Sequence, residues 1–126
     1  MNKTIVFDSK VVDSLLSYAR IQHPREGVLL LKGKVDKEKI LVNDAEIPPF
    51  ATHGRVFSFF PLHMLPIDFS IVGVAHSHPS GALKPSRADL NRFYGRIMVI
   101  VAYPYQTQQD MAVFDSEGKA LKYEVL

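Results

Sequence analysis

The 126-residue chain contains no cysteine. It therefore has no disulfide framework, no iron–sulfur cluster, no thiolate zinc site and no cysteine nucleophile. Any metal ion must be held by histidine, aspartate, glutamate or water. This absence limits the metal chemistry to nitrogen and oxygen ligands before any motif is considered.

The chain also has no large excess of charge of one sign. The chain has 15 Lys+Arg and 13 Asp+Glu, a formal net charge of +2, and the basic residues are scattered. Because no basic stripe results, we expect no nucleic-acid partner. The longest apolar runs, such as 97–103, are far too short to span a bilayer, and the first residues lack the apolar core of a signal peptide. We expect a cytoplasmic protein with no membrane partner.

The composition that remains is globular, with 47% hydrophobic and 22% charged residues, and it predicts one domain over 1–126. A first helix is predicted at 9–22, where apolar residues recur at helical spacing and Pro24 enforces a stop. A second is predicted at 86–94, ended by Gly95. Lys32-Gly33-Lys34 is interpreted as a hairpin turn. Strands are predicted at 4–7, 28–31, 39–47, 55–60, 69–75, 97–103, 111–114 and 120–125. The product is a mixed α/β domain.

One group of residues predicts a metal site. The predicted strand at 69–75 leads into His76 and His78, and Asp89 follows His78 after ten intervening residues. A strand has a period of two residues, so both imidazoles point to the same side, and Asp89 lies in the first turn of the next helix. Two imidazoles and one carboxylate make a three-ligand zinc site with a position open for water, whose pKa zinc lowers to about 7.

A zinc hydrolase also needs a general base beside the water, and Glu26 is the best candidate. It opens an apolar strand that would be buried beside the metal-bearing strand. An unpaired charge in such a place is costly. Contact with a metal-bound water would remove that cost.

Each feature also has a simpler interpretation. The His-x-His pair alone fits two packed or exposed histidines, Ser86-x-x-Asp89 fits a helix-capping box, and Glu26 fits a solvated strand end. Ser86 can cap the helix and serve the site at once. A single zinc site explains all of these features together. The sequence has no His-Glu-x-x-His helix motif and none of the cysteine ligands of zinc deaminases.

These residues resemble the JAMM/MPN+ metalloprotease motif, which is a glutamate, then His-x-His, ten residues and an aspartate. The context resembles the small archaeal members, through Met64-Leu65-Pro66 before the metal strand and Tyr103-Pro104-Tyr105 after the next strand. The likeness extends from about the first helix to the end. His78-Pro79-Ser80-Gly81 also resembles a bacterial relative associated with DNA repair, of the RadC type. Ser77 between the histidines and the short chain favour the protease branch.

The resemblance implies a zinc isopeptidase that removes ubiquitin-like proteins from lysine side chains. It implies that His76, His78 and Asp89 bind one Zn²⁺, that Glu26 is the general base and that Ser86 stabilises the oxyanion. The implied fold is a cytidine-deaminase-like three-layer sandwich, a curved mixed sheet of about seven or eight strands with a helix on each side. Such domains often pair, so a homodimer is compatible with the resemblance.

Two alternatives stay open for the function. The chain would use the same chemistry to trim a ubiquitin-like or sulfur-carrier precursor at a peptide bond, and a zinc-containing scaffold without catalysis is the alternative from another class. The substrate contacts are also open. Met64 and Leu65 fit an apolar flap over a substrate tail and equally a simple packing role. Tyr103 fits the lining of a substrate groove and equally the core.

Overall fold

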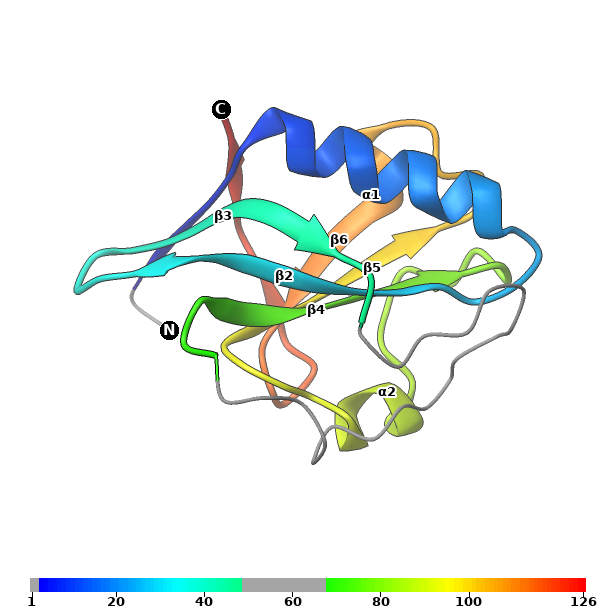
Figure 1. Ribbon diagram of the computed structural model, residues 1–126. Coiled ribbons are helices and arrows are strands. Elements are labelled where there is room, and N and C mark those ends of the chain that lie inside the picture. Colours follow the sequence, from blue (N-terminus) through cyan, green and yellow to red (C-terminus); the bar gives the residue numbers. More distant parts are fainter. Residues whose placement is uncertain (1–2, 49–67) are drawn as a thin grey trace.

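The computed structural model describes residues 3–48 and 68–126 (Figure 1). The predicted strand at 55–60, and Met64 and Leu65, lie outside the described residues. The elements in chain order are β1 (Thr4–Phe7), α1 (Ser9–Gln22), β2 (Val28–Val35), β3 (Lys39–Glu46), β4 (Ile71–His78), α2 (Arg87–Asn91), β5 (Ile97–Ala102), the 3-10 helix η2 (Gln108–Asp110), β6 (Met111–Phe114), β7 (Ala120–Leu121) and β8 (Glu124–Val125).

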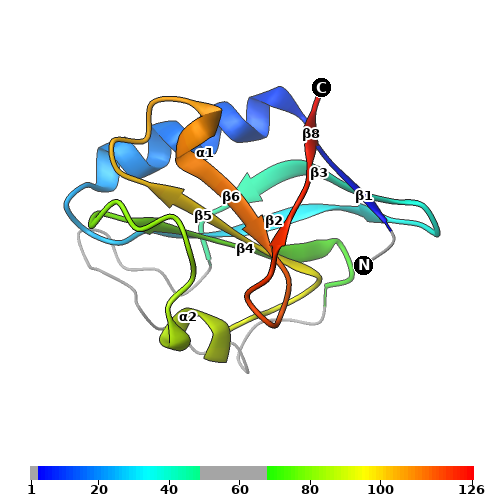
Figure 2. The ribbon, with the colours of Figure 1, turned by 180° about the vertical axis from the view of Figure 1, so that it is seen from behind.

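The strands form one mixed sheet in the order β7-β6-β5-β4-β2-β3-β1-β8. The pairs β4–β5, β1–β3 and β1–β8 are parallel, and the other neighbours are antiparallel. Helix α1 covers one face, and α2 lies on the opposite side (Figures 1 and 2). The expected mixed α/β fold, with a helix on each side of the sheet, is confirmed.

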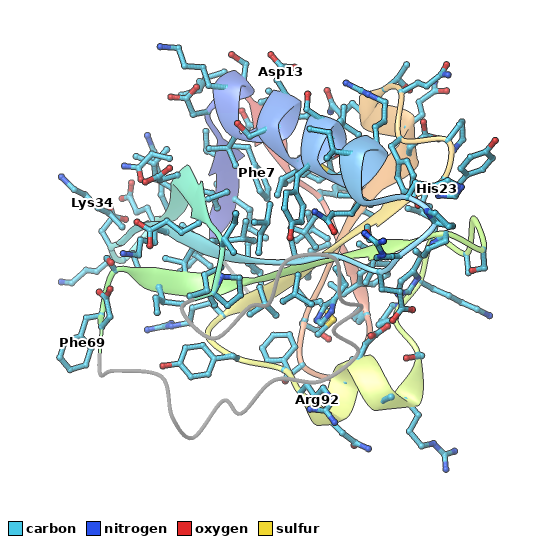
Figure 3. The ribbon with its side chains drawn as sticks, turned by 45° about the vertical axis from the view of Figure 1, so that its right-hand side comes forward. Phe7, Asp13, His23, Lys34, Phe69 and Arg92 are labelled. Atoms are coloured by element: carbon cyan, nitrogen blue, oxygen red, sulfur yellow. The ribbon has the colours of Figure 1, made fainter. Side chains whose placement is uncertain are left out.

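Helix α1 forms where the sequence predicts it. The Asp8 carboxylate accepts from the Lys10 N–H at 2.9 Å and caps the first turn. Asp13 lies on the outer face, whereas Phe7, just before the helix, lies in the interior (Figure 3). The helix ends before Pro24, as predicted, with the His23 N–H donating to the Ala19 carbonyl. The residues that α1 buries against the sheet are Val11, Val12, Leu15, Leu16 and Ala19.

The predicted hairpin turn at Lys32-Gly33-Lys34 is wrong, because β2 continues to Val35. Gly33 marks a bulge in the ladder with β3, where a Cβ would lie 1.6 Å from the Leu41 carbonyl oxygen. The glycine therefore permits a close backbone approach inside a strand. The actual turn follows at 36–38, where the Asp36 carboxylate accepts from the N–H groups of Glu38 and Lys39, both at 2.7 Å.

Other boundaries differ from the prediction as well. The strand predicted at 69–75 is β4, which begins at Ile71 and continues through His78. Helix α2 spans Arg87–Asn91, because Phe93 and Tyr94 leave the helix to pack on an apolar cluster beside β4 and β5. The predicted strand at 120–125 is divided into β7 and β8, which lie at opposite edges of the sheet. Only residues 122–123 separate these strands, so the sheet must curl until its edges approach each other. The ring of Tyr123 meets that of Phe7 edge-on at 5.4 Å across this closure.

Two apolar clusters fill the two sides of the sheet. Alternate residues of β4 and β5 serve each cluster: Ala75 and Val99 belong to the cluster under α1, and Val74 and Met98 to the one on the α2 side. Strand β4, paired with β2 and β5 near the middle, is buried along its whole length. In the described part of the chain no helix has the length and apolarity needed to cross a membrane.

Candidate metal centre

The His-x-His pair ends the central strand. His76 is the ladder partner of Val28 on β2 and of Ile100 on β5. By strand alternation, His76 and His78 share the side of Val74, which faces α2 and not α1. Both are buried, with 6% and 8% of their surface exposed. The sheet thus presents two buried imidazoles on the side where α2 lies.

Asp89 is held toward these histidines by the cap of α2. Its N–H donates to Ser86 Oγ at 3.0 Å, and its Oδ2 accepts from the Ser86 N–H at 2.8 Å. The same Oδ2 lies 2.9 Å from His78 Nε2, and Oδ1 lies 4.0 Å from His76 Nδ1. The capping-box interpretation is therefore correct, and it also aims the carboxylate at the histidine pair.

His78 is oriented by a second contact. Its Nδ1 lies 2.8 Å from the Ala82 carbonyl, an acceptor that requires the proton on Nδ1. Burial lowers the pKa of His78, but hydrogen bonds to Asp89 and Ala82 raise it more, so its pKa lies above the ordinary value. Metal-binding histidines donate their other ring N–H to such a carbonyl, leaving Nε2 free to coordinate.

His76 has an unsatisfied ring nitrogen. Its Nε2 is buried and has no hydrogen-bond partner. Burial lowers the pKa of His76, opposed by the charge of Asp89, and this favours the neutral imidazole. A buried polar atom without a partner costs about 1–3 kcal/mol. A metal ion is a partner that would remove this cost.

The carboxylate has the protonation state that a metal needs. Burial raises the pKa of Asp89, but the hydrogen bonds to His78 and to the Ser86 backbone, with the charges of both histidines, lower it to about 2. Asp89 is therefore ionised at neutral pH. A neutral imidazole, a second imidazole with its Nδ1 occupied and a carboxylate form a nitrogen and oxygen donor set suited to zinc.

These side chains do not yet surround a common point. Within 3–48 and 68–126, no three His, Asp or Glu side chains are arranged to hold a metal ion as they stand. Asp89 Oδ2 bonds His78 Nε2 directly, so an ion would replace this hydrogen bond and part the two groups. The donor types fit the ion, and a small opening of the Asp89–His78 contact is what binding requires.

Glu26 lies at the adjoining strand end. It precedes the buried Gly27 and stands two residues before Val28, the ladder partner of His76. Its side chain is half-buried, and its charge contributes to raising the pKa of both His78 and Tyr105. Glu26 is therefore close enough to His78 and to Tyr105 for its charge to act on both.

Ser86 is exposed, and its Oγ accepts the cap hydrogen bond. A hydroxyl that accepts in this way retains its own hydrogen for donation to another group. The side chain can therefore cap α2 and still donate to a substrate atom beside the Asp89 carboxylate.

Tyr103 lies at the surface beside the site. It is 52% exposed, stacks on His23 at 4.7 Å, and donates its N–H to the His78 carbonyl at 3.1 Å. The core interpretation is therefore wrong for Tyr103. Its neighbour Tyr105 is buried, with 1% of its surface exposed, and its hydroxyl lies 2.9 Å from His23 Nδ1. Figure 3 shows His23 at the end of α1.

Sequence reasoning did not find two supporting groups. The Ala82 carbonyl acts through the backbone, so its residue type carries no signal. The sequence does carry a signal for Ser77, because it is a polar residue at a buried strand position. Its side chain lies on the face opposite to the histidines.

Comparisons with known proteins identify the class. The model of the prokaryotic homologues of the JAB domain matches residues 8–115. A protein from Haloferax volcanii, named "Probable metalloprotease", is 34% identical over 122 residues, covering 91% of this chain and 75% of that protein. The chain therefore belongs to the JAB/MPN domain family, in its prokaryotic branch, and this confirms the resemblance drawn from the motif.

Solved structures share the fold. A JAB1/MPN domain protein from Archaeoglobus fulgidus matches with a TM-score of 0.70 and 28% identity, covering 95% of this chain and 97% of that one. The structure described as JAMM, a metalloprotease-like zinc site in the proteasome and signalosome, matches with a TM-score of 0.72 and 24% identity, covering 98% and 99%. The family assignment and the curled eight-stranded sheet thus agree.

Proposed function

We propose that the protein is a zinc metallopeptidase that hydrolyses the bond between the C-terminal glycine of a ubiquitin-like protein and a lysine side chain. The observation that carries this proposal is the placement of Asp89, whose capped carboxylate faces both His76 and His78. The orphaned Nε2 of His76 supports a metal ion there. One zinc ion per protein chain would be held by these three side chains. When bound, the ion would lower the pKa of a water molecule to about 7.

The chain's own residues supply the remaining chemistry. Glu26 accepts the proton of the water at its carboxylate and returns it to the departing lysine amine. The Ser86 hydroxyl donates to the oxygen on which negative charge develops. Ala82 holds the His78 ring, and the cap of α2 holds Asp89, so that neither ligand needs to reorient during the reaction.

The substrate class rests on the family assignment and on the surface beside the site. From the resemblance of the motif, with which the family membership agrees, we propose a ubiquitin-like protein as partner, in the cytoplasm. We propose that Tyr103 contacts the extended tail of this partner, and its exposure on the segment that leaves β5 supports that role. Met64 and Leu65 are proposed as further contacts from sequence alone.

The test is cleavage of defined conjugates. Zinc-loaded protein is incubated with a ubiquitin-like protein joined to lysine, and with the same protein as a linear fusion, each with and without chelator. Chelator-sensitive release from lysine supports the proposal. Cleavage of the linear fusion alone identifies a processing peptidase, and stoichiometric zinc without any cleavage identifies a scaffold.

A further inference from the structure

Ser77 joins the metal-bearing strand to the segment that carries Glu26. Its N–H donates to the Gly27 carbonyl at 3.0 Å, and its side-chain oxygen accepts from the Gly27 N–H at 2.6 Å. Both bonds are inside the protein, because Ser77 is 4% exposed. The two strands are therefore fastened at two points immediately beyond their last ladder pair, Val28 with His76.

The second of these bonds departs from a regular ladder. Continuing the register by one residue places Gly27 opposite Ser77, and such a pair ordinarily exchanges two backbone bonds. Here the Gly27 N–H donates to the hydroxyl of Ser77. By strand alternation this hydroxyl lies on the α1 side, opposite to His76 and His78. The Gly27 N–H is consequently turned toward α1 and away from the metal face.

This orientation has a direct effect on Glu26. The Gly27 N–H belongs to the planar peptide group that joins Glu26 to Gly27, so fixing the N–H fixes the whole group. The backbone of Glu26 then has one fewer free dihedral angle, although Glu26 lies outside any helix or strand. A half-buried carboxylate on an irregular segment thereby gains a defined direction.

Gly27 is needed for the same contact. A Cβ at this position would lie 2.6 Å from Cε2 of Tyr18 and 3.3 Å from Ser77 Oγ. Tyr18 and Ala19 of α1 line a small cavity together with Gly27 and Ser77. The absence of a side chain lets α1 and the Ser77 hydroxyl close on the peptide from the same side.

We propose that Ser77 is a positioning residue for Glu26: its hydroxyl fixes the Glu26–Gly27 peptide and so directs the Glu26 carboxylate toward the face of His76 and His78. Ser77 cannot touch the substrate or the metal, because its side chain is buried on the other face. The catalytic consequence rests on the proposed function, whereas the structural consequence does not.

The variants are Ser77→Ala, which removes the acceptor, and Ser77→Thr, which retains it. Ser70→Ala is the matched control, because Ser70 precedes the opposite end of β4, where its hydroxyl bonds Asp68 at 2.6 Å. We expect Ser77→Ala to lower kcat by about 10–100-fold, since misplacing a catalytic group by about 1 Å has effects of this size. KM and zinc content should change little, and Ser77→Thr should restore the rate.

A double variant separates positioning from general damage. In a Glu26→Gln background, adding Ser77→Ala should cause no further loss, because the group through which Ser77 acts is already absent. An equal loss in both backgrounds would overturn the proposal.

Two measurements do not depend on hydrolysis. By NMR, the Gly27 amide should exchange slowly with solvent in the parent, Ser77→Thr and Ser70→Ala proteins and at least tenfold faster in Ser77→Ala. The carboxyl ¹³C resonance of Glu26 should respond to zinc in the first three proteins and lose that response in Ser77→Ala. Unchanged exchange and an unchanged zinc response in Ser77→Ala refute the positioning role, even where cleavage is seen. Both effects without any cleavage refute the proposed peptidase and leave the positioning role supported.

If Ser77→Ala does not fold, Ser77→Cys takes its place, because sulfur is a weak acceptor. The Gly27 amide should then be equally protected from exchange in the parent and Ser77→Thr proteins and less protected in Ser77→Cys. Fast exchange of the Gly27 amide in the parent protein itself would also contradict the proposal.

Discussion

Asp89 Oδ2 accepts the N–H of its own helix cap, Ser86, at 2.8 Å and lies 2.9 Å from Nε2 of His78. One oxygen atom thus serves helix α2 and the histidine pair together. The sheet and the helix are linked at this atom, so changes at Asp89 report on capping and on metal binding at once.

The two roles of Asp89 should separate by substitution. Asp89→Asn retains an oxygen that can accept from Ser86 but loses the charge, so we expect loss of zinc with a small effect on the metal-free fold. Asp89→Ala should lose zinc and also the reciprocal bond of the capping box, from the Ser86 N–H to the carboxylate, at a cost of about 1 kcal/mol. Elemental analysis and urea unfolding of both variants check this. Full zinc content in Asp89→Asn would remove Asp89 from the ligand set.

Because the His76 Nε2 has no partner, we expect His76→Leu to raise the stability of the metal-free protein and to abolish the stabilisation by zinc. His76→Leu removes a buried polar atom without a partner, so the metal-free protein should become more stable by about 1 kcal/mol. The same variant should no longer gain thermal stability from zinc, whereas the parent protein should gain several degrees. Thermal unfolding of both proteins, with zinc and with chelator, measures the two effects. A zinc-dependent rise in the Tm of His76→Leu would show that the ion binds elsewhere.

Glu26→Gln tests the base without altering the shape of the site. The amide cannot take a proton from water, so hydrolysis should fall by about 10²–10⁴-fold. Zinc content should stay near that of the parent, because Glu26 is not assigned as a ligand. Cleavage assays and elemental analysis are made on the same samples. An active Glu26→Gln protein would assign the base role to another group.

Ser86 can be tested apart from its capping role. Glycine is nearly as good as serine at a helix N-cap, within a few tenths of a kcal/mol, but it has no hydroxyl. Ser86→Gly should therefore leave stability almost unchanged while lowering the rate by about 10²–10³-fold. Ser86→Thr keeps the hydroxyl and is the control. Equal rates for the glycine variant and the parent would leave Ser86 with the cap alone.

The turn between β2 and β3 predicts a pH dependence of stability. Backbone hydrogen bonds from Glu38 and Lys39 hold the pKa of Asp36 below its ordinary value. Its contribution is therefore complete above the unfolded-state pKa of about 3.9 and is lost as pH falls through the lower folded-state pKa. Urea midpoints of the parent protein and Asp36→Ala should differ at pH 7 and converge in acid. Asp13→Ala, on the exposed face of α1, is the control for the removal of a surface carboxylate.

The sequence predicted much of the fold because its signals are local. The helical spacing of Val11 to Ala19 and the stop before Pro24 gave the bounds of α1. The prediction of a turn at Gly33 and of one strand at 120–125 failed for another reason. A glycine that admits the Leu41 carbonyl looks like a turn glycine, and nothing local shows that residues 122–123 connect opposite edges of the sheet.

The sequence by itself determined the chemistry available: without cysteine, only imidazole, carboxylate and water remain for a metal, and the period of a strand puts His76 and His78 on one face. Only the tertiary structure decided how those groups meet. It placed Asp89 against His78 through a helix cap, and it joined the N–H of Gly27, the residue after Glu26, to the hydroxyl of Ser77. Residue types are set locally, whereas hydrogen-bond partners 11 and 50 residues apart are chosen by the packing of the sheet and helices around them.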